Sequence, residues 1–294
     1  NGNPWGIEFM RMFDMSNDSH LFHSKAGEGL LPLYEAKMIH QFDHRWATYE
    51  GDSSDDCTLA EKANPNFEVT PRYWVDNSEV KRRLAEKNYT RQWMFLMRGI
   101  TNATNSRTLI TTIAPLSAAG NSCPILIPSE NIAAEEISLL QANLSSLVLD
   151  YIAKQKIGGL NLNLFIAKQF PIIPPNDYLE KDKDFISKRV LELTYTSVNM
   201  QSFAADVGYY SVPFSFNAER RLVIQSEVDA YYAKLYGLER SDLVYILDPS
   251  QIDPNYPSET FSALKRSEEK EFGEYRTQRL VLEAWDKLEA GELY

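Results

Sequence analysis

Hydrophobic and polar residues alternate along four short segments in the first 115 residues. The segments are rich in aromatic or β-branched residues, are separated by Asn, Asp, Gly and Pro, and span Ile7–Met15, Pro32–Phe42, Gln92–Thr101 and Arg107–Ile113. Alternation with a period of two is typical of a strand with one buried face. The pattern therefore predicts β-strands in this part of the chain.

A helical period replaces the alternation from Ser129 onwards. Ser129 can cap a helix, Gly158 and Gly159 can end it, and apolar residues recur three or four positions apart at Ile137, Leu140, Leu144, Leu147 and Tyr151. This spacing predicts one long helix over Ser129–Ile157. The same pattern predicts later helices over Asp182–Asp206, Ala218–Tyr236 and Phe272–Glu289.

Strands followed by helices indicate an α+β fold class. The expected architecture is an N-terminal strand-rich part, then a long helix, then a C-terminal helical part, with a boundary near Pro174 in the segment FPIIPP. We expect residues 1–175 and 176–294 to form separate domains.

Composition supports a globular protein. The 294 residues are 44% hydrophobic, enough for a sizeable core, and no apolar run approaches the roughly 18 residues of a membrane span. Cys57 and Cys123 are isolated cysteines without a metal or disulfide spacing pattern, as expected in a reducing compartment. A cytoplasmic location without a membrane partner is the expectation.

Charge is distributed unevenly around a net value of −11, which on average disfavours a nucleic-acid partner. Residues 72–109 hold eight basic and three acidic residues, and residues 151–176 hold three lysines and no acid. Residues 180–294 hold 14 basic and 21 acidic residues. The first half can therefore present a basic face, although the charged stretch Glu79–Arg91 also fits a solvated amphipathic helix.

The stretch LYEAKMIHQFDHRWATYEG, residues 33–51, combines charged and aromatic residues with two of the four histidines. His40 and His44, like His20 and His23, have a spacing that would suit a zinc site on a helix, but the strand-like alternation argues against one. Glu35-Ala36-Lys37 also matches half of a magnesium-dependent nuclease site, with Asp14 or Asp18 as the upstream carboxylate. The third interpretation is a strand and turn that face DNA without bound metal.

Motifs for other chemistry are missing from the sequence. It has no GxGxxG, no Walker lysine loop and no GxSxG, so nucleotide binding and serine hydrolysis have no support.

Several fragments in order resemble one protein family. They are PLYEAKMIHQFDHRWATY, PRYWV, RQWMFLMRGITNATNSRTLITTIAP, LLQANLSSLVLDYIAKQKIGGLNLNLFIAKQFPIIPP, ERR, EVDAYYAKLYGL, YILDP and GEYRT, which together extend over most of the chain. The set resembles the C-terminal target-recognition region of Eco57I-like and TaqI-like DNA adenine-N6 methyltransferases, found in type II or IIG restriction-modification and phage-defence systems. Ala36 and Trp46 depart from the family's usual glycine and phenylalanine.

The resemblance implies that residues 1–175 recognise a double-stranded DNA target and that residues 176–294 form a helical support and interdomain region. Such enzymes bind S-adenosylmethionine in a methyltransferase domain with an Asn-Pro-Pro-aromatic tetrad, where a flipped adenine is held. Here the nearest string, IPPNDY at residues 173–178, has its letters in another order. We therefore expect no cofactor and no catalytic residue in this chain, and a methyltransferase domain of the same polypeptide as its partner.

Candidate DNA contacts follow from the resemblance and from side-chain chemistry. Arg, Lys, Gln, Asn and His bind base edges or phosphates, and glycines allow close backbone approach. The candidate residues are Lys37, His40, Gln41, His44, Arg45, Arg72, Arg98, Asn105, Arg107, Lys154, Lys156, Gly158, Gly159 and Asn161. Lys37 to Arg45 are expected at base edges, whereas Arg107 in the loop NATNSRT and the segment KQKIGGLNLN are expected at phosphates.

Structural roles remain open for the same residues. Asp43 can pair with Arg45 or His44 to orient a turn, NATNSRT can be an ordinary turn, and the paired glycines can end a helix whose lysines match its dipole. We expect Arg220, Arg221 and GEYRT to serve helix packing and interdomain contact. Two other functions remain open: a magnesium nuclease using Asp18, Glu35 and Lys37, and a protein-interaction subunit with acidic helices.

Overall fold

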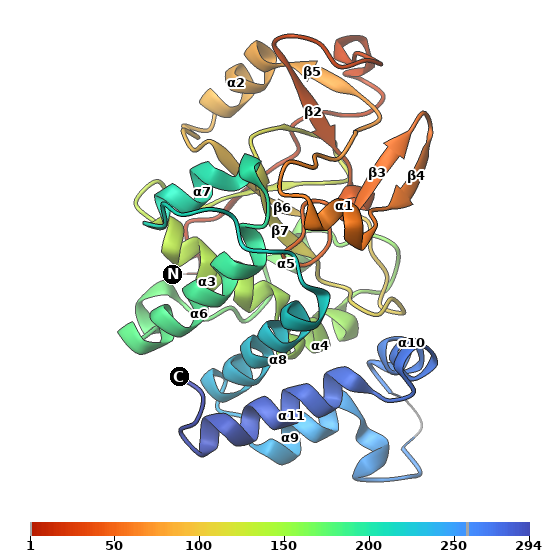
Figure 1. Ribbon diagram of the computed structural model, residues 1–294, viewed down its shortest axis with the longest axis vertical. Helices are drawn as coiled ribbons and strands as arrows, with labels where there is room; N and C mark the ends of the chain where they lie inside the picture. Colours follow the sequence, from red (N-terminus) through yellow and green to blue (C-terminus); the bar gives the residue numbers. More distant parts are fainter. Residues whose placement is uncertain (1, 257–258) are drawn as a thin grey trace. The chain divides into compact units, whose positions relative to one another are not determined.

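The computed structural model describes residues 2–256 and 259–294. Strands occur as far as Ile127, and helices dominate afterwards (Figure 1). The predicted α+β class is confirmed.

The described chain divides into two compact units. Unit 1 comprises Asn1–Ile100, Ile110–Gln141 and Ile173–Phe216, and unit 2 comprises Thr101–Leu109, Ala142–Ile172 and Asn217–Tyr294. Each unit therefore joins segments that are distant in the sequence. The predicted domains, residues 1–175 and 176–294, stay a prediction.

Unit 1 contains an antiparallel four-stranded sheet. Its order is β1-β9-β6-β7, formed by β1 Glu8–Met10, β9 Ile125–Ile127, β6 Trp93–Met97 and β7 Thr111–Pro115. Every residue of β6 is buried, because this strand lies between two neighbours. Three of the predicted strands thus overlap β1, β6 and β7, although each is shorter or shifted.

A second sheet in unit 1 has the order β5-β2-β8, and a separate hairpin joins β3 to β4. The strands are β2 Leu30–Tyr34, β5 Trp74–Asp76, β8 Ala118–Ala119, β3 Ala47–Glu50 and β4 Ser53–Asp56. The predicted strand Pro32–Phe42 therefore ends at Tyr34. Glu35 then caps a 3₁₀ turn, η2 Ala36–Met38, which takes the backbone out of the sheet.

The core of unit 1 combines residues from both sheets. Met10, Leu33, Met94, Leu96 and Ile125 belong to one cluster of buried side chains. The helical segments of unit 1 are η1 Ser19–Leu21, η2, α1 Leu59–Ala63, α2 Asn77–Ala85, the greater part of α3 Ala134–Ser145, η3 Pro175–Asp177, α6 Glu180–Thr194, η4 Val198–Met200 and α7 Gln201–Asp206.

The predicted helix Asp182–Asp206 is broken between α6 and α7. Thr196 O at the break accepts a hydrogen bond from the Arg45 guanidinium, and Val198 N donates to Pro65 O. These long-range bonds replace the helical bonds at a sequence, TYTSVN, whose β-branched and hydroxyl residues favour helix interiors weakly.

The predicted long helix Ser129–Ile157 is also two helices, α3 Ala134–Ser145 and α4 Leu147–Lys156. Ser146 has an extended backbone (ψ 148°), and its hydroxyl accepts from Leu149 N (3.4 Å) and donates to Asn143 O (2.8 Å). Asp229 receives the N–H of Leu147 at 2.7 Å. The break is therefore capped by side chains that the helical period does not reveal.

Unit 2 is helical apart from its loops. It contains the end of α3, then α4, α5 Leu164–Ala167, α8 Ala218–Leu235, α9 Arg240–Leu247, η5 Pro249–Gln251, α10 Ser262–Phe272 and α11 Arg276–Glu289. α11 packs along α8 and α9 (Figure 1). Leu147, Leu243, Phe261, Val281 and Trp285 form the centre of its core.

The predicted helix Phe272–Glu289 begins four residues later than expected. Phe272 instead ends α10, and Gly273 follows in the left-handed conformation (φ 76°) that glycine adopts readily after a helix.

Helix length and polarity exclude a transmembrane helix in the described part of the chain. None of its helices is both long enough and apolar enough to cross a bilayer.

Ser146→Ala should destabilise the protein by about 1 kcal/mol, because the first turn of α4 loses its capping hydroxyl. Urea unfolding followed by circular dichroism measures the change. Ser226→Ala is the matched control: Ser226 is equally buried, but its hydroxyl binds Leu222 O inside α8 and caps no helix. Equal effects of the two substitutions would contradict the capping role.

Candidate nucleic-acid interface

The segment from Glu35 to Trp46 forms a turn, and most of its polar side chains lie inside unit 1. His40 N donates to Asp43 O (2.8 Å), and Asp43 N donates to His40 O (3.1 Å). Phe42 in this turn has a positive φ of 57°, an unfavourable backbone conformation for a bulky residue. Lys37 is exposed and His40 is half-buried, whereas Gln41, His44 and Arg45 are buried.

Arg45 is fully buried and holds three loops together. Its guanidinium donates to Lys62 O (2.8 Å), Asn64 O (2.9 Å) and Thr196 O (3.1 Å). Burial lowers the pKa of Arg45, because a charged group loses hydration inside the protein. A base contact by Arg45 would require this network to open.

Asp43 orients the same turn. Its carboxylate accepts from Arg45 N (2.9 Å) and pairs with the buried ammonium of Lys62 (2.6 Å). Lys62 Nζ also lies 4.5 Å from the ring centre of Trp46, and this ring packs against His40 at 4.3 Å between centres. The structural role considered for Asp43 is therefore present, with Lys62 as its charged partner.

His44 forms a buried polar cluster with residues that follow α6. Its Nε2 lies 3.0 Å from Ser197 Oγ, and Ser197 Oγ donates to Asn199 Oδ1 at 2.6 Å. His44 Nε2 also lies 3.3 Å from Asn199 Oδ1. The arrangement links the turn to η4.

Asp18, the upstream carboxylate of the nuclease interpretation, forms an ion pair with Arg83 at 2.8 Å. Hydrogen bonding to Arg83 lowers the pKa of Asp18. Within residues 2–256 and 259–294, no group of three or more His, Cys, Asp or Glu side chains is arranged to hold a metal ion.

Arg72 and Arg98 also contact protein groups. Arg72 pairs with Asp52 at 2.8 Å on the surface, and Arg98 Nε donates to Ile39 O at 2.8 Å. Burial lowers the pKa of Arg98. Arg98 thus supports the turn after η2 from inside, while Arg72 stays partly accessible.

The loop Asn102–Thr108 in unit 2 is fixed by the end of α4. Lys154, a buried residue, donates its ammonium protons to Ala103 O (3.0 Å), Asn105 O and Thr108 Oγ1 (3.0 Å). Burial lowers the pKa of Lys154. The lysine therefore shapes the loop, and Thr104 and Asn105 stay exposed at its tip.

Arg107 anchors the other side of this loop. Its guanidinium lies 3.7 Å from Asp150 and 3.8 Å from Asp229, and it donates to Ser145 O. Asp150 in turn accepts the N–H groups of Thr108 (3.0 Å) and Leu109 (2.6 Å). Burial raises the pKa of Asp229 to about 6, although Arg107 opposes this shift.

The segment after α4 runs beside the loop. Thr101 N donates to Leu160 O at 2.9 Å, and Lys156, Gly158, Gly159 and Asn161 are exposed. A Cβ atom at either glycine would meet no atom within 4 Å. The structure thus brings together Asn105, Arg107, Lys154 and the segment 156–161, which were predicted separately.

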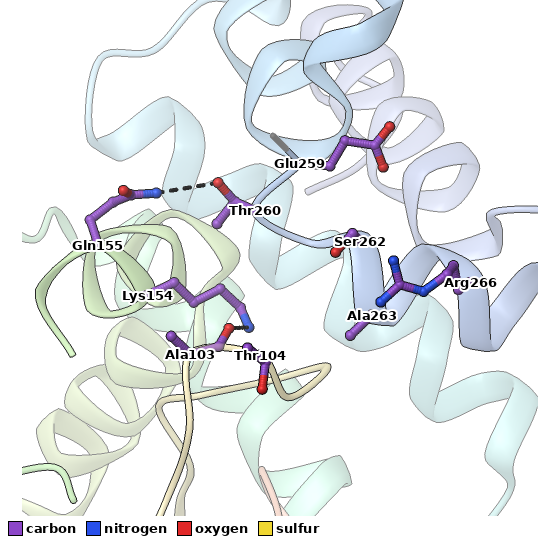
Figure 2. A pocket seen from close by; sticks show the side chains of 9 residues that line it. All are labelled: Ala103, Thr104, Lys154, Gln155, Glu259, Thr260, Ser262, Ala263 and Arg266. Carbon is purple, nitrogen blue, oxygen red and sulfur yellow. Dashed lines mark hydrogen bonds between the residues drawn. The ribbon is translucent and has the colours of Figure 1, made fainter. Parts of the chain in front are cut away.

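A cavity of about 320 Å³ opens beside the loop (Figure 2). Its lining includes Lys154 from the predicted residues, and also Thr104, Gln155, Thr260 and Arg266, which sequence reasoning did not select. Gln155 Nε2 donates to Thr260 Oγ1 at 3.3 Å.

No protein-family model and no curated protein matches the chain.

The carboxylates Asp150 and Asp229 were missed at the sequence level. The only sign of them in the sequence is that each occupies a position on the apolar face of a helix, Asp150 in α4 and Asp229 in α8. An acid at such a position needs a buried partner, which here is Arg107.

Arg45→Lys should destabilise the protein by about 2–5 kcal/mol, since each buried carbonyl left without a donor costs about 1–3 kcal/mol. Urea unfolding measures the change, and Arg72→Lys, in an exposed pair, should cost less than about 1 kcal/mol. Unfolding of Arg45→Lys at the wild-type midpoint would contradict a structural role for Arg45.

Asp229→Asn should change how stability depends on pH. The folded pKa of Asp229 lies above that of an unfolded aspartate, so its contribution is fully present below about pH 4 and is lost as the pH rises through about 6. The wild type should therefore lose on the order of 2–3 kcal/mol relative to Asp229→Asn over this interval.

Urea unfolding at a series of pH values tests this expectation. Asp253→Asn is the control, because Asp253 also accepts a backbone N–H but is exposed. A constant difference between the wild type and Asp229→Asn would show that Asp229 titrates normally.

Proposed function

We propose that this chain is the non-catalytic DNA-recognition portion of a DNA adenine-N6 methyltransferase or of a fused restriction-modification enzyme. The supporting observation is the assembly of two predicted phosphate-binding segments in unit 2. Lys154 binds the backbone of the loop Asn102–Thr108, and Thr101 binds Leu160 in the following segment. The resemblance of the sequence fragments to target-recognition regions supplies the enzyme class.

The chemistry of the exposed groups suits a DNA backbone. Thr104 and Asn105 at the loop tip, with Lys156 and Asn161 beside it, offer hydroxyl, amide and ammonium groups. Such groups make most contacts to phosphate oxygens. The bare backbone at Gly158–Gly159 allows a second chain to approach closely.

The buried cations support DNA binding indirectly. Arg107 and Lys154 are held by protein oxygens, so they position the loop that faces DNA. In unit 1, Arg45 and His44 position the turn that carries Lys37 and His40. The direct contacts with DNA then come from the exposed residues of the loop in unit 2 and of the turn in unit 1.

Methyl transfer lies outside the role proposed for this chain. The resemblance assigns S-adenosylmethionine and the reacting adenine to a methyltransferase domain of the same polypeptide. Residues 1–294 then bind and orient double-stranded DNA for that domain, without a cofactor of their own. Calorimetric titration with S-adenosylmethionine tests this division, and micromolar binding would contradict it.

Lys156→Gln should weaken binding to duplex DNA of any sequence and should reduce the slope of log affinity against log salt by about one. Fluorescence anisotropy with a labelled duplex, between about 50 and 200 mM salt, measures the slope. Lys287→Gln removes the same charge from an exposed position on α11 and should leave the slope unchanged.

Two outcomes would favour another function. Absence of DNA binding at low salt would leave the acidic helices as a protein-docking surface. Cleavage of plasmid DNA with Mg²⁺, lost in Glu35→Gln but retained in Lys287→Gln, would favour the nuclease with Asp18, Glu35 and Lys37.

A further inference from the structure

Two large apolar side chains project from the segment that follows α4. Leu160 is 63% exposed and Phe165 is 76% exposed. Leu162 and Phe170 in the same segment are only 2% and 7% exposed, so their side chains are packed inside the protein. Phe165 is therefore exposed in a segment that also contains buried apolar residues.

The backbone around Phe165 is held by hydrogen bonds. Asn163 O accepts from Ile166 N (2.9 Å) and Ala167 N (3.1 Å), which closes the single turn of α5. Phe165 O accepts from Gln169 Nε2 at 3.3 Å, and Leu160 O accepts from Thr101 N. The backbone at both exposed side chains is thus held by hydrogen bonds, and the bond from Thr101 links it to the start of the loop Asn102–Thr108.

The charge around this segment identifies the kind of partner. Residues 151–176 contain no acid, and Lys156 and Lys168 are exposed on either side of Phe165 along the chain. Asn161 and Asn163 are exposed between them. In a chain of net charge −11, an acid-free segment with exposed lysines and an exposed aromatic ring matches a polyanion that also offers flat apolar faces.

Nucleic acid has both properties. Lysines bind its phosphates, and aromatic side chains stack on its bases because every base has a π-face. Exposed Phe and Leu side chains also serve as wedges that enter a base step from the minor groove. A protein partner would satisfy the apolar side chains but gives no reason for the absence of acids.

We infer that Phe165, assisted by Leu160, stacks on a base of the bound DNA while Lys156 and Lys168 contact the flanking phosphates. This inference depends on the proposed DNA-recognition function and adds a base-contacting residue to it. Stacking requires no particular base, so Phe165 contributes affinity and a local distortion of the duplex, and sequence choice comes from other residues.

Phe165→Ala in the full chain tests the inference. Affinity for a labelled duplex at low salt should fall by up to roughly 5- to 150-fold, the range for one lost base–aromatic stack, because the cost of unstacking the duplex offsets part of the gain; the salt slope should stay unchanged. Phe165→Trp should keep the affinity. Tyr210→Ala removes an 84% exposed aromatic side chain from unit 1 and should bind DNA as the wild type does.

Tryptophan fluorescence gives a second readout. DNA should quench Phe165→Trp more strongly than the wild type, because the new indole stacks on a base, and Tyr210→Trp should show no additional quenching. Urea midpoints of the Phe165 variants should match the wild type, since the ring is exposed, so a loss of affinity cannot come from unfolding.

The outcomes separate this inference from the function on which it depends. If the wild type fails to bind DNA at low salt, the proposed function itself is wrong. If the wild type binds and Phe165→Ala binds equally well, only the role of Phe165 is wrong. Unchanged DNA binding with lost association of a methyltransferase domain would instead assign Phe165 to a protein interface.

Discussion

Buried cations that bind backbone carbonyl groups determine the shape of the loops in both units. A cation removed from water needs several oxygen partners, or it destabilises the fold. Arg45 meets this requirement in unit 1 with carbonyls from two segments, the end of α1 and the residues after α6, and Lys154 meets it in unit 2 with oxygens of a single loop. The loops have few apolar residues of their own, so these bonds replace a local core.

Arg107, a third cation with little exposure, has two buried carboxylates as its oxygen partners. Arg107 lies close to Asp150 and Asp229, and both carboxylates also accept backbone N–H groups. The N–H groups belong to the loop before β7 and to the first turn of α4. One charged cluster therefore sets the position of a loop and the point at which the predicted long helix breaks.

Periodicity predicted the fold class and the helical regions of α3–α4, α6–α7, α8 and α11, because apolar spacing reflects which face of an element is buried. It could not predict the breaks at Ser146 and at Tyr195–Ser197, since these depend on partners more than 80 residues away in the sequence, such as Asp229 and Arg45. For the candidate site, residue type identified which side chains carry donors. It could not distinguish donors that face solvent, such as Lys156, from donors used inside the protein, such as Lys154, because both fit the same sequence pattern.

The distribution of exposed donors limits how this chain can bind DNA. Affinity from phosphate contacts grows with the number of cations that reach the duplex, and much of the positive charge near the candidate loops is already paired with protein oxygens. A surface with few accessible lysines then gives a shallow salt dependence and weak electrostatic attraction. Apolar contacts with bases would contribute a larger share of the binding free energy than in a strongly basic DNA-binding domain. In the proposed enzyme, a chain of this kind orients the duplex, and the methyltransferase domain supplies the remaining contacts.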